Sequence, residues 1–185
     1  MAFRESIPFI ERRGLLPPAE LARRAGIDPE EVLLRRHRLE LALPDGPAVL
    51  NHQGPLLMGR NKDFIDGGDM RGWARQLDER VFLWPGGALQ AFSASVADAV
   101  PITLDAGPLY DRIGERIDLS PINSGQASRR PPRRGPWLYV PATAGAEAFR
   151  ENRRKRGLVR SPDNVTEVSV RGGIDAATLA ACRIA

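Results

Sequence analysis

The sequence predicts an α+β fold, in which short helices and separate β-strands occupy different parts of a single domain. Helix-start patterns dominate the first 38 residues. From Leu39 onward, apolar residues alternate with others, which is the two-residue period of a half-buried strand. A second alternating run covers residues 164–171. Because helices and strands do not alternate regularly, we expect α+β architecture rather than parallel βαβ winding.

Three helix starts are expected before the first strand. Ser6 is an N-cap candidate followed by a proline in the first turn, and Gly14 ends that helix. The second helix begins at Pro17-Pro18 and runs towards Gly26. The third begins at Asp28, where a cap, an N1 proline and two acidic residues follow in their preferred order. All three helices are short.

The middle of the chain mixes strands and helices. Residues 39–43 form a strand that a turn at 44–47 ends, and Asp69 caps a helix whose apolar residues lie on one face. Val81–Trp84 is strongly β-prone and is expected to be an interior strand. The remaining expected elements are a helix at 88–97, a strand at 100–104, a helix at 108–113, an irregular segment at 120–136, a strand at 137–140, a strand at 164–171 and a helix that Asp175 caps.

Length and composition limit the class of protein. A chain of 185 residues fits one domain, residues 1–185, with a core of its own. It has no apolar run of roughly 18 residues, the length of a membrane span, and no signal-peptide pattern at its start, so we expect a cytoplasmic protein without membrane contact. Cys182 is the only cysteine, and with two histidines no zinc-site spacing occurs. No metal site is predicted.

Positive charge is concentrated in residues 129–160. This segment holds ten Arg or Lys residues and two Glu, a net charge of +8, whereas the rest of the chain carries −4. A phosphate-bearing partner is one interpretation, and a solvated, partly mobile loop is the other. The residues proposed to contact an anionic partner such as nucleic acid are Arg129, Arg130, Arg133, Arg134, Arg153, Arg154, Lys155 and Arg156.

Common catalytic motifs are absent, and the remaining signals are individually weak. The sequence has no nucleophile elbow, P-loop, dinucleotide-binding glycine fingerprint or zinc-protease motif. Glu167 lies within the alternating run at 164–171, on the face opposite Val168, and points either to solvent or into a cleft. The cluster Arg35-Arg36-His37-Arg38 can hold a diphosphate or simply end a helix. Trp84 can pack in the core or stack on a ring.

Residues 21–32 allow a competing interpretation. They resemble the first helix, glycine turn and second helix of a helix-turn-helix, with Arg35, Arg36 and Arg38 available for phosphates. Strand-like residues follow immediately, where such domains normally continue with a helix. The pattern therefore offers a weaker route to nucleic-acid binding than the basic segment does.

Several stretches together resemble a family of small bacterial proteins that is distantly similar to the ADP-ribosyltransferase fold, including toxins that ADP-ribosylate thymidine in single-stranded DNA. The matches span most of the chain in a consistent order. They are Ile7-Pro8-Phe9-Ile10, Arg13-Gly14-Leu15-Leu16, Arg35-Arg36, Trp73, Arg80-Val81-Phe82-Leu83-Trp84, Ser120-Pro121-Ile122-Asn123-Ser124-Gly125 and Val165-Thr166-Glu167-Val168-Ser169-Val170.

The resemblance implies a split β-sheet with short flanking helices and NAD, as the substrate, in the cleft. Glu167 matches the strand glutamate that engages the nicotinamide ribose while the glycosidic bond breaks. Arg35 or Arg36 matches an arginine near the NAD phosphates. Asn123 and Ser124 are candidates for the acceptor side, and Trp84 for the nicotinamide pocket.

One departure from the family pattern leaves three functions open. Related enzymes bring an NAD-anchoring histidine on a first strand, and this sequence has none before Ser6. The preferred hypothesis is an ADP-ribosyltransferase with an unidentified acceptor. The alternatives are a nucleic-acid-binding module that uses residues 129–160, and a catalytically silent protein that keeps the fold.

Overall fold

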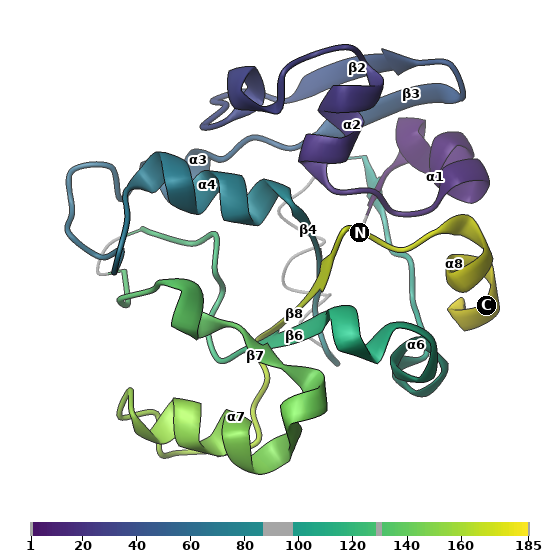
Figure 1. Cartoon of the computed structure of the whole chain (residues 1–185). Coiled ribbons are helices and arrows are strands. Elements are labelled where there is room, and N and C mark those ends of the chain that lie inside the picture. The colour runs from purple at the N-terminus through teal and green to yellow at the C-terminus, as the bar shows by residue number, and fades with distance from the viewer. Residues whose placement is uncertain (1, 87–97, 129–130, 185) are drawn as a thin grey trace.

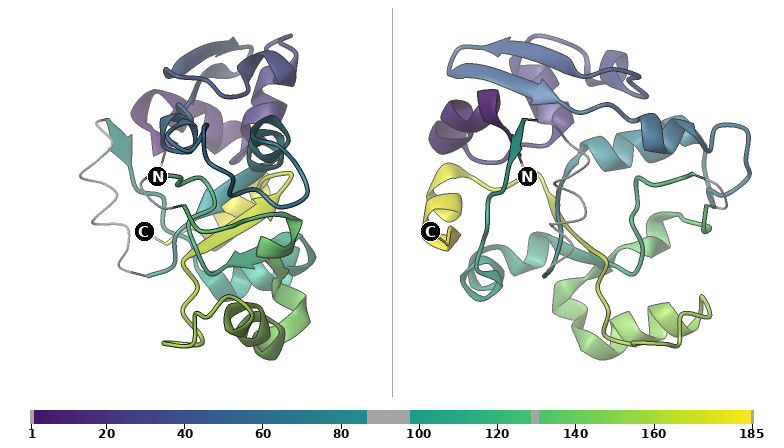
Figure 2. Two further views of the ribbon diagram at one scale, coloured as in Figure 1. Left: turned by 90° about the vertical axis from the view of Figure 1, so that its left-hand side faces the viewer. Right: turned by 180° about the vertical axis from the view of Figure 1, so that it is seen from behind.

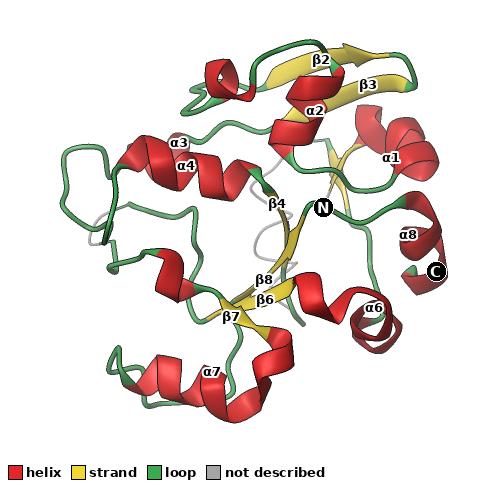
Figure 3. Cartoon of the chain, in the orientation of Figure 1, coloured by secondary structure: helices red, strands yellow, loops and turns green. Residues whose placement is uncertain are grey.

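A computed structural model describes residues 2–86, 98–128 and 131–184 (Figure 1). These residues form a mixed α+β structure with small antiparallel sheets and, among the described residues, seven α-helices (Figure 3). The α-helices are α1 Ile7–Arg13, α2 Pro18–Arg24, α3 Gly54–Leu57, α4 Met70–Asp78, α6 Ala106–Ile113, α7 Gly145–Arg154 and α8 Ala176–Cys182. The strands are β1 Ala2–Phe3, β2 Leu39–Leu43, β3 Gly46–Leu50, β4 Arg80–Leu83, β5 Ala99–Val100, β6 Ile117–Ser120, β7 Val140–Pro141 and β8 Glu167–Arg171. Short 3-10 turns are η1 Arg4–Ser6, η2 Pro29–Val32, η3 Gly114–Arg116, η4 Pro136–Leu138 and η5 Ala142–Ala144.

The largest sheet has four antiparallel strands in the order β4-β8-β6-β7. Strand β8 is central, since Val170 pairs with Val81 of β4 on one side and with Ile117 of β6 on the other. The expectation of an interior strand at Val81–Trp84 is wrong, because β4 pairs with β8 alone within the described residues and forms the sheet edge.

A separate hairpin, β2–β3, lies across the molecule from this sheet, beside α1 and α2 (Figures 1 and 2). Its turn needs Gly46, whose φ of 115° lies in a region that favours glycine. Buried side chains of the hairpin pack with those of α1, α2, α6, α8 and the four-stranded sheet. They form the first core cluster, which includes Phe9, Leu21, Leu50, Ile113 and Val170. That packing fixes the hairpin relative to β8.

The two ends of the chain meet in this cluster. Leu15 and Ile174 form an antiparallel bridge, with backbone hydrogen bonds of 2.8 Å in both directions. Gly14, with a φ of 89°, approaches so closely that a Cβ atom at this position would lie 2.1 Å from the carbonyl oxygen of Ile174. Glycine is therefore required there for close backbone contact.

A second core cluster lies between α4 and the irregular segment that follows β6. It contains Trp73, Leu77, Phe64, Leu138 and Tyr139, among other residues. The Trp73 and Tyr139 rings stack with centroids 5.7 Å apart. Asp69 caps α4 by accepting a hydrogen bond from the Gly72 amide, as the sequence predicts.

Several sequence-based boundaries are corrected by the structure. The third helix start forms only the 3-10 turn η2, and the strand expected at 100–104 is limited to β5. Residues 137–140 form the end of η4 and the start of β7 rather than one strand. Strand β8 begins at Glu167, three residues later than expected. The helix expected at 88–97 lies outside the described residues.

None of the helices in the described residues combines the length and the apolar composition that crossing a lipid bilayer requires.

Candidate functional site

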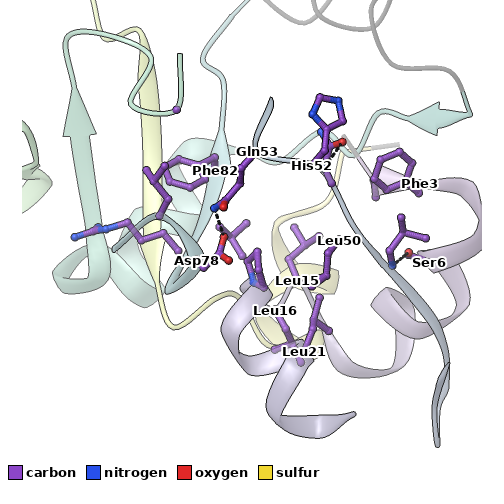
Figure 4. Close-up of a pocket in the computed structure, with 18 of the residues that line it drawn as sticks. Phe3, Ser6, Leu15, Leu16, Leu21, Leu50, His52, Gln53, Asp78 and Phe82 are labelled. Carbon is purple, nitrogen blue, oxygen red and sulfur yellow. Dashed lines mark hydrogen bonds between the residues drawn. The ribbon is translucent and has the colours of Figure 1, made fainter. Parts of the chain in front are cut away.

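A cavity of about 390 Å³ lies between the β2–β3 hairpin and the four-stranded sheet. Figure 4 shows apolar side chains on its hairpin side, including Leu15, Leu21 and Leu50, and polar groups such as His52 and Gln53 along another wall. The sheet side adds residues of β4, the turn after β6, and Glu167 of β8. Two separate sheets therefore build one cavity.

Residues chosen from the sequence for the proposed site converge on this cavity. Of the six, the five that line it are Arg35, Trp84, Asn123, Ser124 and Glu167. They come from four separated parts of the chain, so their convergence depends on the fold. Arg36 is exposed and is not among the lining residues.

Glu167 is the most unusual of these side chains. It is only 2% exposed, so its face of β8 is buried and does not meet solvent. Its Oε1 accepts a hydrogen bond from the Ser124 amide at 3.2 Å. Burial raises the pKa of Glu167 to about 7, against the opposing effects of Ser124 and of the Arg134 and Arg80 charges. Close to neutral pH, this carboxyl group can both hold and release a proton.

The Ser124 turn is held rigidly from behind the cavity. Arg134 is fully buried and donates to the carbonyl oxygens of Ser124 at 2.5 Å and Gln126 at 2.8 Å. The Trp73 indole donates to the same Ser124 carbonyl at 3.1 Å. These bonds fix the Ser124 amide that faces Glu167. This part of the segment expected to be irregular, residues 120–136, is thus a structured support for the carboxylate.

Arg35 lines the cavity, but its guanidinium is already engaged by protein atoms. It pairs with the buried Asp78 through bonds of 2.5 and 3.1 Å, and its Nε donates to the Asn51 carbonyl. Gln53 donates to the same carboxylate at 3.0 Å. Burial raises the pKa of Asp78, and Arg35 opposes this rise. The Arg35 fork thus holds the hairpin against α4.

Arg80 occupies a comparable position on the sheet side. Its Nη1 lies 2.5 Å from an Asp118 oxygen, and its guanidinium lies 4.0 Å above the centre of the Tyr139 ring. Arg80 and Arg35 are both cavity-lining cations, and each has a buried aspartate as partner. The cavity wall therefore combines paired charges with one unpaired carboxyl group, Glu167.

The basic segment is largely used by the fold. Arg134 and Arg153 are buried and bond to backbone carbonyl oxygens. Arg156 lies 3.2 Å above the centre of the Trp137 ring. The members that pair with carboxylates are the exposed Arg133, Arg154 and Lys155 and the half-buried Arg150. Arg129 and Arg130 lie outside the described residues.

The helix-turn-helix interpretation of residues 21–32 does not match the structure. Helix α2 ends at Arg24, and the expected second helix is the four-residue 3-10 turn η2. Leu21, Ala22 and Val32 are buried in the first core cluster. The segment is therefore a packing element, because its apolar residues serve the core.

Residues outside the sequence-based selection also contribute. His52 lines the cavity, and its Nδ1 accepts the Gly54 amide at 3.0 Å, which leaves Nε2 as the hydrogen-bond donor of the neutral ring. Arg80 and Tyr139 lie near Glu167; Arg80 belongs to a matched stretch but has no predicted role, and no motif marks Tyr139. No group of three or more potential metal ligands occurs in the described parts of the chain.

Comparison with known proteins gives a family but no activity. The chain belongs to a family of unknown function, DUF7002, whose model matches residues 1–180. Neither a curated protein nor a solved structure matches it.

Proposed function

We propose that this DUF7002 protein is an ADP-ribosyltransferase that consumes NAD and uses Glu167 as its catalytic carboxylate. The observation that carries the proposal is the convergence of Glu167, Ser124, Asn123 and Trp84 on one cavity. These residues belong to three matched stretches that lie far apart in the sequence, so only the fold brings them together. The resemblance of several stretches of the sequence to ADP-ribosyltransferases supports the same conclusion.

The cavity suits a nucleotide-like substrate in size and chemistry. Its volume of about 390 Å³ falls within the roughly 300–1,000 Å³ typical of small-molecule sites. Apolar side chains can cover a flat ring, while His52 and Asn123 offer hydrogen bonds. Since Arg35 is paired with Asp78, we do not assign it to the NAD phosphates and instead give it the role of holding the cavity wall.

In the proposed reaction, the bond between the ribose C1′ atom and the nicotinamide nitrogen breaks, and its electron pair leaves with nicotinamide. The acceptor nucleophile then bonds to C1′ and gives up its proton to Glu167 or to solvent. The ionised Glu167 stabilises the developing positive charge on the ribose and orients its hydroxyl groups. Removing such a group lowers turnover by about 100-fold or more.

The test is NAD consumption, measured as nicotinamide release, by the wild type and by Glu167→Gln with candidate acceptors. We expect loss of at least about 100-fold in the variant, with a cooperative thermal transition showing that it folds. Glu40→Gln, on an exposed position of β2, is the matched control and should retain full turnover. Equal turnover by the wild type and Glu167→Gln would exclude Glu167. Absence of both NAD binding and turnover in the wild type would leave the silent fold as the explanation.

A second candidate function, nucleic-acid binding, is favoured by one observation at the edge of the cavity. Arg36 and Arg38 are exposed and have no carboxylate partner in the described part of the chain. Arg38 lies 4.5 Å above the Phe3 ring, which itself lines the cavity. The available positive charge is therefore next to the cavity.

A further inference from the structure

Two hydroxyl groups behind Glu167 are buried without partners. Within the described residues, Ser124 Oγ and Tyr139 Oη are buried side-chain oxygens that make no hydrogen bond in the structure. A buried hydroxyl without a partner costs about 1–3 kcal/mol, so two of them in one place call for an explanation. Both lie beside the one carboxyl group that the cavity leaves unpaired.

Ser124 adjoins both Glu167 and Tyr139. The Ser124 side chain lies next to Glu167 on one side and next to the Tyr139 hydroxyl on the other. The Ser124 backbone is fixed by Arg134 and Trp73. The Tyr139 ring is held between the Trp73 ring, at 5.7 Å, and the Arg80 guanidinium, at 4.0 Å. The two hydroxyl hydrogens can rotate while the Ser124 backbone and the Tyr139 ring stay in place.

We infer that Tyr139 and Ser124 are positioning residues that form a hydrogen-bond chain to Glu167. When Glu167 is ionised, the Tyr139 hydroxyl donates to Ser124 Oγ, and the Ser124 hydroxyl donates to the carboxylate. When Glu167 is protonated, the same hydroxyls rotate, so that Glu167 donates to Ser124 and Ser124 donates to Tyr139. No covalent bond changes in either arrangement.

The chain favours the ionised form, because a carboxylate gains more from a donated hydrogen bond than a neutral carboxyl group does. The charged groups facing Glu167 are Arg80 from β4 and Arg134 from the segment after β6, and Arg80 is in turn paired with Asp118. These cations act in the same direction as the chain. Burial acts in the opposite direction and is the largest effect.

The experiment measures the pKa of Glu167 directly, by carbon-13 NMR of glutamate-labelled protein without NAD, with Glu167→Gln identifying the signal. Ser124→Ala should raise the pKa by about one unit, and Tyr139→Phe by a smaller amount, because Tyr139 acts through Ser124. Adding Tyr139→Phe to Ser124→Ala should produce little further change. Tyr110→Phe, at a residue 46% exposed, is the control and should leave the pKa unchanged.

A Glu167 pKa that moves by less than about 0.2 units in both single variants would overturn the proposed hydrogen-bond chain. Both substitutions keep the stacked ring and the Ser124 amide, so the variants are expected to fold. If one of these variants does not fold, the pH dependence of unfolding of the other variant tests the hydrogen-bond chain. Below pH 4.5, Glu167 is protonated in both the folded and the unfolded protein, so its burial carries no charge penalty. The free energy of unfolding then falls as pH rises from about 4.5 to about 7. Removing the hydrogen-bond chain raises the folded-state pKa of Glu167 and should extend this fall in stability to higher pH.

The catalytic consequence rests on the proposed function, and the two ideas fail separately. NAD turnover should rise with pH as Glu167 ionises, and Ser124→Ala should shift that rise upward by the same amount as the NMR pKa. A shifted Glu167 pKa without any NAD turnover in the wild type would overturn the proposed transferase function and support the hydrogen-bond chain. Turnover that depends on Glu167 with an unmoved pKa would do the reverse.

Discussion

The arginine-rich segments at residues 35–38 and 129–160 look alike in the sequence, yet the fold uses their charges differently. In the longer segment, Arg134 and Arg153 are buried, and most exposed cations pair with nearby carboxylates. In the shorter one, Arg35 is paired with Asp78, while Arg36 and Arg38 have no carboxylate partner in the parts of the chain that are described. The segment with less formal charge thus presents more unpaired charge per residue.

This difference shows that arginine serves two physical purposes in one chain. A buried guanidinium can satisfy several backbone carbonyl oxygens at once, which makes it a structural crosslink. An exposed, unpaired guanidinium remains available for phosphate. Local charge density predicts neither role, because the role depends on carboxylates and carbonyls brought close by distant parts of the chain.

The largest expected effect is that of Arg134→Met. This change removes the donor to the Gln126 carbonyl oxygen and one of the two donors to the Ser124 carbonyl oxygen, and should lower the free energy of unfolding by about 4 kcal/mol. Its neighbour Arg133 has a side chain 55% exposed in a surface ion pair, so Arg133→Met should cost less than about 1 kcal/mol. Urea denaturation of both variants makes the comparison. Similar losses at the two positions would contradict the division between structural and surface arginines.

A somewhat smaller loss is expected for Arg35→Met, about 3 kcal/mol, because it leaves Asp78 buried and unpaired. The loss should grow as pH rises, since removal of Arg35 raises the folded-state pKa of Asp78 further above its unfolded value. Arg36→Met, at the adjacent exposed position, should change stability by less than about 0.5 kcal/mol. Thermal unfolding at two pH values tests both statements, and a pH-independent loss would argue against the buried pair.

The smallest effect concerns nucleic-acid affinity. Replacing both Arg36 and Arg38 by Gln should weaken binding of a single-stranded oligonucleotide about tenfold. The slope of log affinity against log salt concentration should become shallower by about 1.4. Replacing the ion-paired Arg150 and Arg154 with Gln removes the same formal charge and should change affinity less than about twofold. Fluorescence anisotropy at several salt concentrations measures both. The opposite ranking would make residues 129–160 the binding segment.

Much of the secondary structure follows from local signals. The helix caps at Asp69 and Asp175 and the strand at Leu39–Leu43 are confirmed, since each depends on neighbouring residues. The edge position of β4 could not be predicted, because it depends on which strand pairs with β8. The same holds for η2, where tertiary packing of Val32 prevails over a well-formed helix start.

The site was predictable in part. Glu167, Asn123 and Ser124 were found through sequence matches, and their meeting at one cavity is a property of the fold. The strand pattern allows Glu167 to face either solvent or a cleft, and the side chain lies at the cavity, 2% exposed, beside Ser124, Arg80 and Arg134 from distant positions. Arg80 lies in a matched stretch that gave it no role, and no sequence signal marks Tyr139, since both become neighbours of Glu167 only through the fold.

The alkylation rate of the single thiol of the chain can be measured in all of these variants. Cys182 is 1% exposed at the end of α8 and belongs to the first core cluster, whereas Arg134 and Tyr139 lie at the second. An alkylating reagent can reach it only when its surroundings open, so the labelling rate reports the opening of the first cluster without any introduced probe. Slow labelling in Arg134→Met would show that damage behind the Ser124 turn stays local. Fast labelling would show that the two clusters open together.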